Sequence, residues 1–161
     1  MRCDRFITSV GRGCGVGHTG GMLTLSPTKR DDLGNLDPEQ YAIISQWWVD
    51  RGTVPPPREM MPGAGMLALS DGEPIACGFL YMDFTGSGVG VLAWLGISPR
   101  ITSRDGVDAL RILEDALSAY AKDLGCWVLG ATYHSPGIIN LLQSAGFEPV
   151  RSGLTQLFKT L

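Results

Sequence analysis

The hydrophobic pattern of residues 89–124 is the strongest structural signal in the chain. Val89–Ser98 is apolar except for its two glycines and its closing serine, which is typical of a buried strand. After a Pro-Arg turn, apolar residues recur every three or four positions, as expected for one face of a long helix. They are Val107, Leu110, Leu113, Leu117, Tyr120 and Leu124. Thr102 and Asp105 are expected to form a capping box at its start, and Gly125 a left-handed cap at its end.

Two elements and a hairpin precede this unit. Met22–Ser26 alternates and is expected to be the first strand. Asp37, followed by proline and glutamate, is a typical N-cap and predicts a helix that Gly52 ends. Its expected inner residues are Tyr41, Ile44, either Trp47 or Trp48, and Val49. Because adjacent tryptophans cannot both face the core, the other is expected at the rim of a groove or against a loop. The strands Met66–Leu69 and Pro74–Phe84 are predicted to form the hairpin.

The remaining elements follow the long helix. Cys126–Tyr133 is predicted to be a further buried strand, and Ser135 with Pro136 is expected to begin a short helix. Two short strands, or a strand and its return, are expected to close the chain. The order predicts an α/β domain with a mixed, mostly antiparallel sheet flanked by helices. A parallel crossover joins Val89–Ser98 to Cys126–Tyr133, and ligands favour the carboxyl ends of such strands.

Composition limits the class of protein. With 161 residues and 44% hydrophobic residues, the chain is long enough for one domain with a substantial core. The net charge of −3 gives no basic surface that would favour nucleic acid or an anionic membrane. The four cysteines are far apart, which is typical of a reducing, cytoplasmic compartment. No apolar stretch approaches the roughly 20 residues of a membrane span, so no membrane partner is expected.

The first 21 residues differ from the rest. They are glycine-rich and without apolar periodicity, so we expect a flexible leader at 1–21 and a single domain at 22–161. Cys3, Cys14 and His18 are the conceivable metal ligands in this segment. Three scattered residues make a poor site, and no metal is expected.

Several polar residues fall where chemistry is plausible. Arg100 and Arg104 stand beside the start of the long helix, where backbone amides and positive charge can hold a phosphate; they can equally be solvated arginines of an ordinary crossover. Alternation places Tyr81 and Asp83 on one strand face, and Trp94 lies on the neighbouring strand. A carboxylate and a phenol there could hold or deprotonate an amine, or belong to an exposed sheet face.

Four stretches carry a resemblance to a known family: DGEPIACGFLYMDF, VLAWLGISPR, GCWVLGATYHSP and INLLQSAGFEPV. Over about Met22–Leu161 the chain resembles the GCN5-related N-acetyltransferase (GNAT) superfamily. The amino-acid sequence of these stretches is most similar to a divergent branch of the superfamily that is common in phages and prophages. Related folds there include the Mom protein of phage Mu, which modifies DNA adenines.

The resemblance implies an acyl-coenzyme A-dependent N-acyltransferase that transfers an acetyl group directly to an unidentified amine. Its acyl cleft would lie at the parallel crossover. The residues implied in binding acetyl-coenzyme A are Leu95, Gly96 and Ile97 for the thioester, and Arg100, Thr102, Ser103, Arg104 and Gly106 for the pyrophosphate. The amine would belong to a small molecule, a protein or a nucleobase, and a homodimer stays open.

The chain departs from the family pattern at two places. Ser103 and Asp105 stand where the family's phosphate loop has glycine or alanine, and Leu142 stands where its tyrosine general acid is usual. Tyr133 and His134 are the nearest alternatives for that acid. These departures keep two other functions open: a phage-type base-modifying enzyme, and a catalytically silent scaffold that binds a protein partner.

Overall fold

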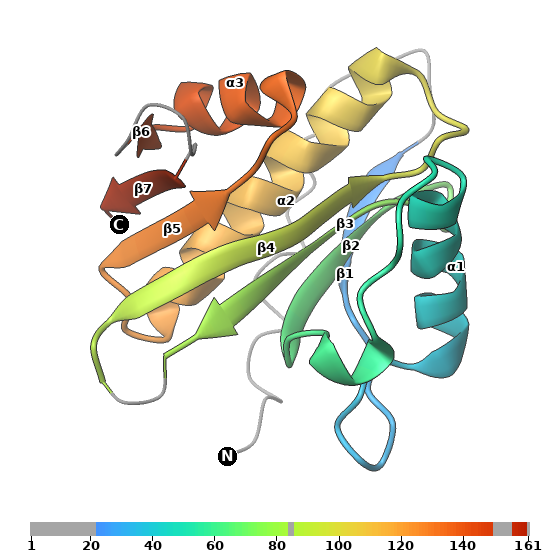
Figure 1. The fold of residues 1–161 in the computed structure, drawn as a ribbon, viewed down its shortest axis with the longest axis horizontal. Helices are drawn as coiled ribbons and strands as arrows, with labels where there is room; N and C mark the ends of the chain where they lie inside the picture. Colours follow the sequence, from blue (N-terminus) through green and yellow to red (C-terminus); the bar gives the residue numbers. More distant parts are fainter. Residues whose placement is uncertain (1–21, 84–85, 150–155, 161) are drawn as a thin grey trace.

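One seven-stranded sheet runs through the computed structural model, which describes residues 22–83, 86–149 and 156–160 (Figure 1). The strands are β1 Leu23–Pro27, β2 Ala64–Ser70, β3 Glu73–Met82, β4 Val89–Ile97, β5 Val128–Thr132, β6 Glu148–Pro149 and β7 Gln156–Thr160. Their spatial order is β1-β2-β3-β4-β5-β7-β6. All neighbours are antiparallel except β4 and β5. The predicted fold class is therefore confirmed, whereas the leader predicted at 1–21 lies outside the described residues.

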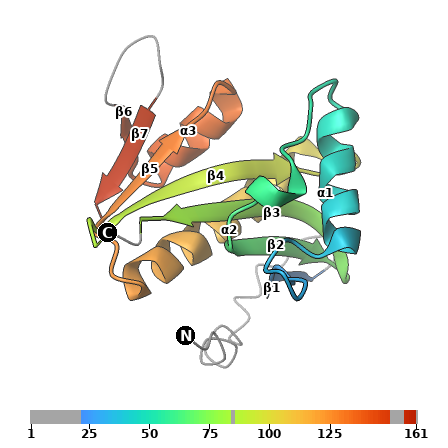
Figure 2. The same ribbon diagram turned by 60° about the horizontal axis from the view of Figure 1, so that its bottom comes forward.

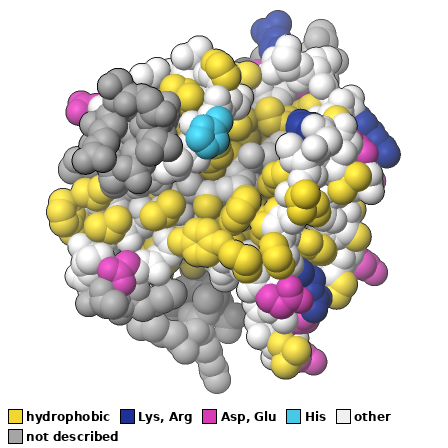
Figure 3. All heavy atoms as spheres, in the orientation of Figure 1, with side chains coloured by type: hydrophobic (Ala, Val, Ile, Leu, Met, Phe, Trp, Pro, Cys, Tyr) yellow, Lys and Arg dark blue, Asp and Glu magenta, His cyan; other side chains and the backbone are white. Residues whose placement is uncertain are grey.

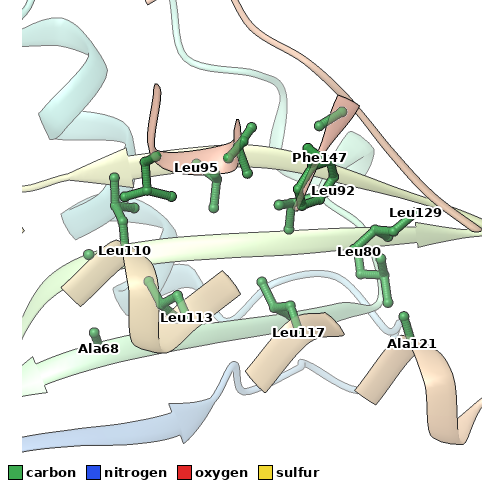
Figure 4. Close-up of a cluster of buried hydrophobic side chains, with 14 of the residues drawn as sticks. Ala68, Leu80, Leu92, Leu95, Leu110, Leu113, Leu117, Ala121, Leu129 and Phe147 are labelled. Atoms are coloured by element: carbon green, nitrogen blue, oxygen red, sulfur yellow. The ribbon is translucent and has the colours of Figure 1, made fainter. Parts of the chain in front are cut away.

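Helices cover both faces of the sheet (Figures 1 and 2). They are α1 Pro38–Val49, α2 Ser103–Asp123 and α3 Pro136–Ser144, with a single 3₁₀ turn, η1, at Arg58–Met60. The core of α2 and α3 against the sheet is the larger of two buried clusters, and Figure 4 shows part of it. The second cluster lies under α1 and includes Ile44, Trp47, Cys77 and Phe79. Since Phe79 and Leu80 belong to different clusters, β3 is packed on both faces.

The long helix follows its predicted pattern closely. Leu110, Leu113 and Leu117 are buried against the sheet, as the spacing predicts. Val107 and Leu124 are exposed instead. Val107 lies off the centre of the stripe, and Leu124 follows the last helical residue.

The α1 helix has the predicted start and a partly different inner face. The Asp37 carboxylate accepts hydrogen bonds from the amides of Glu39 and Gln40, at 3.2 and 3.1 Å. Trp47 is the tryptophan that enters the core. The prediction for Val49 was wrong: its side chain is 53% exposed. Two residues after Trp47, it is turned by about 200° around the helix and cannot share its face.

Three local expectations are refined. The predicted strand to Phe84 ends at Met82, and the strand predicted from Cys126 begins at Val128. Gly125 has the predicted left-handed conformation, with φ +88°. At the start of α2 the capping box is partial, because the Asp105 carboxylate accepts from the Thr102 hydroxyl at 2.7 Å rather than from a backbone amide.

Two properties of the described residues bear on function. None of the described helices combines the length and the apolar composition that crossing a bilayer requires. The described part of the chain also holds no group of three or more His, Cys, Asp or Glu side chains placed for a metal ion. Cys3, Cys14 and His18 lie outside it.

Gly106 brings the start of α2 into close contact with the end of β4. The residue is buried, and a Cβ atom at this position would lie 2.8 Å from Ile97 Cγ2 and 3.2 Å from Ile97 Cδ1. A distance below 3.0 Å is not tolerated between carbon atoms, so a larger residue would force the helix away from the strand.

We therefore expect Gly106→Ala to lower the free energy of unfolding by about 1–3 kcal/mol, because overpacking outweighs the better helix propensity of alanine. Gly137→Ala is the matched control: Gly137 lies in the first turn of α3, and a Cβ added there would have Ser135 Oγ as its nearest neighbour, at 3.9 Å. That variant should unfold at the same urea concentration as the parent or slightly above it. Ile97→Ala should recover part of the loss in the double variant; equal stability of Gly106→Ala and the parent would contradict the close contact.

Candidate functional site

The two parallel strands part from each other near their carboxyl ends. β4 and β5 are paired only from Val89↔Val128 to Leu92↔Ala131. β4 continues to Ile97, whereas β5 ends at Thr132, and Figure 1 shows the two strands diverging beyond the paired stretch. Among the described residues, 93–97 therefore have no strand partner on this side. The opening, called the gap below, lies at the carboxyl end of a parallel pair, where ligands bind in α/β sheets.

A bulge in β4 turns backbone amides toward the gap. Phe79 pairs with Ala93 and Cys77 with Gly96, so β4 has one residue more than β3 between these pairs. Trp94 lies in the bulge and has φ +52°, a left-handed conformation that bulky residues rarely adopt. The Leu95 N–H consequently points away from β3, and it donates a hydrogen bond to Tyr133 Oη at 3.1 Å.

The alternation of the strand distinguishes the three residues implied in thioester binding. The Ser98 amide donates to Ile75 O on β3 at 2.7 Å, so the Ile97 amide points to the opposite side, toward the gap. Gly96 instead pairs with β3, and its missing side chain leaves room for the Cys77 thiol, whose Sγ would lie 3.1 Å from a Cβ there, with Trp48 Cη2 next at 3.4 Å. Leu95 and Ile97 thus offer donors to the gap, whereas Gly96 serves packing. Trp48 is the second tryptophan of the pair, and it packs at this rim.

Tyr133 occupies the gap from the end of β5. Burial raises the pKa of its phenol well above the ordinary value, and the hydrogen bond from Leu95 opposes this only in part. The phenol is neutral at physiological pH and keeps a proton to donate. His134, the next residue, has an exposed side chain.

Cys77 lies behind the bulge and is not a nucleophile. Its Sγ donates to the carbonyl of Trp94 at 3.6 Å, and burial raises the pKa of the thiol to about 12. The neutral thiol therefore helps to hold the bulge rather than to react.

The start of α2 borders the gap with positive charge. Arg100 and Arg104 have exposed side chains there, and the first amides of the helix, at Ser103 and Arg104, have no partner within the helix. The amide of Asp105 is used by the Thr102 hydroxyl at 3.2 Å. These groups can hold an anion, since backbone donors, the helix dipole and two guanidinium groups point to the same end.

The structure corrects the role expected of Gly106. Its amide donates to Thr102 O at 3.0 Å as the first hydrogen bond of the helix, and its Cα is buried against Ile97. The residue therefore positions the helix and has no donor left for a phosphate. Asp105, by contrast, directs its carboxylate to the Thr102 hydroxyl.

Tyr81 and Asp83 are not brought together at the gap. The Tyr81 hydroxyl accepts from Trp94 Nε1 at 3.1 Å and donates to Met60 O at 2.6 Å, so it lies beside the bulge. Asp83 follows the end of β3, and its amide donates to Val89 O at 3.2 Å. Val89 is six residues from Leu95 along β4, which corresponds to about 20 Å. Asp83 thus lies beside the first residue of β4, because β3 runs antiparallel to β4 and its end meets the start of that strand.

Met60 is a site residue that sequence reasoning missed. It comes from η1, in a proline-rich stretch that the pattern predicts only as an extended loop. No periodicity marks such a residue, because its position depends on the contact of its carbonyl with Tyr81, a residue of another element.

Comparisons with known proteins identify the fold. No family model matches the chain, and no curated protein matches it in sequence. Solved structures do match. N-acetylglutamate synthase from Neisseria gonorrhoeae, complexed with coenzyme A and N-acetyl-glutamate, aligns with a TM-score of 0.64 and 17% identity over 88% of this chain and 35% of that one. The chain thus spans about a third of that protein.

Other solved structures match over nearly their whole length. An acetyltransferase from Thermus thermophilus aligns with a TM-score of 0.58 and 18% identity, over 86% of this chain and 97% of that one. A Klebsiella pneumoniae protein with the provisional description of acyl-CoA N-acyltransferase has a TM-score of 0.62 and 20% identity, over 87% and 98%. At such identities the likeness establishes the fold, which is that of GNAT acetyltransferases.

The raised pKa of Tyr133 predicts a pH dependence of stability. In the unfolded chain a tyrosine ionises near pH 10, whereas the buried phenol stays protonated, so alkaline pH favours the unfolded state. The contribution of Tyr133 is therefore full below pH 10 and is lost as the pH rises above it. We expect the difference in unfolding free energy between the parent and Tyr133→Phe to fall by about 1.4 kcal/mol from pH 9 to pH 11. A constant difference over that range, measured by urea unfolding, would show that the hydroxyl is accessible to water.

Proposed function

We propose that this protein is an acyl-coenzyme A-dependent N-acyltransferase, most simply an N-acetyltransferase, that transfers the acyl group directly to an amine. The observation that carries the proposal is the Leu95 N–H, which the bulge at Trp94 turns into the gap between β4 and β5. A backbone donor held in a partly buried gap is suited to the oxygen of a thioester carbonyl, where negative charge grows during attack by an amine. The fold of acetyltransferases whose structures contain coenzyme A supports the same assignment.

The donor side of the proposed site is the start of α2. Arg100, Ser103 and Arg104 would bind the pyrophosphate through two guanidinium groups and the free amides of the first turn. Thr102 would act through its backbone, since its hydroxyl is used by Asp105. The Asp105 carboxylate would repel a bound anion, and its hydrogen bond with Thr102 reduces that electrostatic repulsion only in part.

Tyr133 is the proposed general acid. Its hydroxyl lies 3.1 Å from the Leu95 nitrogen, so a carbonyl oxygen that replaced it would leave the phenol beside the departing sulfur. Burial keeps the phenol protonated, which is the state an acid needs. His134 is exposed and is the second choice. The position of Leu142, buried in the core of α3, offers no proton.

The resemblance to one branch of the superfamily, that of phage and prophage enzymes, remains part of this proposal and rests on the amino-acid sequences of the strands alone. It is the reason for retaining a nucleobase among the acceptors to be tested.

The binding assignment is tested by Arg100→Ala combined with Arg104→Ala. A charge-assisted contact to phosphate contributes roughly 1.5–3 kcal/mol, so the double variant should bind acetyl-coenzyme A at least about tenfold more weakly. Calorimetry measures the dissociation constant. Arg111→Ala is the control on the same helix, where Arg111 pairs with Asp108 at 3.7 Å and lies away from the first turn. Equal affinities of the double variant and the parent, with the fold intact, would refute the assignment.

The acid assignment is tested by Tyr133→Phe. General acid catalysis contributes about 10²–10⁴-fold, so turnover should fall at least tens-fold while the dissociation constant of acetyl-coenzyme A changes little. His134→Ala should keep most of the turnover. Full activity of Tyr133→Phe from pH 6 to 9 would exclude the phenol as the acid, and a parent that binds acetyl-coenzyme A but acetylates no amine would favour a silent scaffold.

A further inference from the structure

Four apolar side chains line the open face of the sheet beside the gap, and they are called the acceptor wall below. They are Met60 of η1, Tyr81 of β3, and Val91 and Trp94 of β4. Met60 is 57% exposed, Val91 41% and Tyr81 37%, and Trp94 is half-buried. Figure 3 shows a band of hydrophobic side chains across this face over β4. Large apolar side chains gathered on one surface mark a binding site more often than isolated ones do.

The polar atoms of the wall already have partners. The indole N–H of Trp94 donates to the Tyr81 hydroxyl at 3.1 Å, and that hydroxyl donates to the carbonyl of Met60 at 2.6 Å. Both polar hydrogens are therefore used within the wall. What remains for a ligand is ring surface, a thioether and a methyl-bearing side chain, none of which carries a charge.

The wall begins at the amide that would hold the acyl carbonyl. The nitrogen of Leu95 is bonded to the carbonyl carbon of Trp94, so the Trp94 Cα lies about 2.5 Å from that nitrogen. On the other face of β4, Leu92 and Leu95 are buried in the core formed with α2. An amine that reaches a carbonyl at Leu95 from the open face must therefore pass over the wall.

Charged groups near this face are directed elsewhere. Arg58, two residues from Met60, pairs with Asp31 at 3.3 Å. Asp83 stands beside Val89, two residues along β4 from Val91, and it already takes part in an interaction of its own. Glu59 precedes Met60 but is exposed, so a cation beside it would keep its water. A second ammonium group laid on the wall would instead lose water, and the ring faces of Tyr81 and Trp94 would offset only part of that loss.

We propose that the acceptor is a primary monoamine with an apolar aryl or alkyl body, which the acceptor wall binds; this rests on the acyltransferase function proposed above. The amine nitrogen forms a bond to the thioester carbon, and the carbon–sulfur bond breaks. The sulfur takes the Tyr133 proton, the amine releases a proton to solvent, and Tyr133 is reprotonated from solvent.

A matched pair of amines tests the class of acceptor. Hexylamine and 1,6-diaminohexane have the same chain, but only the second carries a charge at its far end. With acetyl-coenzyme A as donor, we expect kcat/KM for hexylamine to exceed that for the diamine at least tenfold. From butylamine to hexylamine it should rise about three- to fourfold per added methylene, if each is buried on the wall.

A charge placed on the wall should reverse the preference. In Val91→Asp, kcat/KM for hexylamine should fall and that for 1,6-diaminohexane should rise, because the new carboxylate gives the second ammonium a partner. Ile112→Asp is the control, since Ile112 is 38% exposed on α2 and lies outside the wall. It should leave the ratio of the two kcat/KM values unchanged.

Binding of N-hexylacetamide, the product expected from hexylamine, separates this inference from the function on which it rests when it is measured by calorimetry. Binding by the parent, lost in Val91→Asp and kept in Ile112→Asp, supports the wall even if no amine is acetylated, in which case the acyltransferase function fails alone. Faster acetylation of the diamine, or of the amino group of adenosine, than of hexylamine would overturn the acceptor class and leave the acyltransferase function standing. Absence of N-hexylacetamide binding together with no chain-length trend would also overturn the wall.

Discussion

Trp94 has a backbone conformation that a bulky side chain rarely adopts, and the arrangement of the candidate site depends on it. The extra residue of the bulge reverses the direction of the next amide, so Leu95 donates away from β3. Such a conformation persists only where neighbouring groups hold it. Here the Cys77 thiol binds the carbonyl of Trp94, and the Tyr81 hydroxyl binds its indole. Both partners come from β3, so the antiparallel β3–β4 pair maintains the site without any contribution from a ligand.

A backbone N–H that is turned into a buried gap needs a partner, and Tyr133 supplies it. A carbonyl that bound Leu95 would therefore exchange one hydrogen bond for another, and the net gain from that contact would be small. Most of the affinity for an acyl donor would have to come from the start of α2, where the arginines and the first amides lie. When the carbonyl replaces the Tyr133 hydroxyl at Leu95, the phenol would come to lie next to the departing sulfur. Binding of the thioester and donation of the proton would then both depend on one movement of the Tyr133 side chain.

The two faces of the sheet differ in how completely they are covered, and therefore in their roles. The face under α2 and α3 is filled with leucine, alanine and phenylalanine side chains, and Gly106 lets α2 come close enough to Ile97 to complete this packing. The opposite face is covered by α1 only in part. At its border, the hydrogen bonds from Trp94 to Tyr81 and from Tyr81 to Met60 hold the proline-rich loop against the sheet. The closed face gives rigidity to β4, and the partly covered face gives access to it.

The sequence alone determined the elements and the fold class, because hydrophobic period, N-caps and glycine positions act over a few residues. The strand at 89–98, the buried stripe Leu110–Leu113–Leu117 and the cap at Gly125 needed no other part of the chain. The resemblance to acetyltransferases also implied roles for Leu95 and Tyr133 that the sequence by itself does not connect. Leu124 was misplaced because period alone does not tell where packing stops, and Val49 because it lies on the other side of α1 from Trp47.

Only the tertiary structure decided which of the candidate residues meet. Tyr133 and Leu95 are 38 positions apart, and their contact depends on where β4 and β5 separate. Asp83 and Tyr81 are two positions apart, yet only the Tyr81 hydroxyl reaches Trp94, because the antiparallel register places Asp83 beside Val89 at the start of β4. Met60 belongs to the site because its backbone carbonyl accepts a hydrogen bond from Tyr81, and no sequence pattern predicts such a contact. Local patterns encode local geometry, whereas a site assembled across strands is set by register, by one bulge and by the point at which two strands diverge.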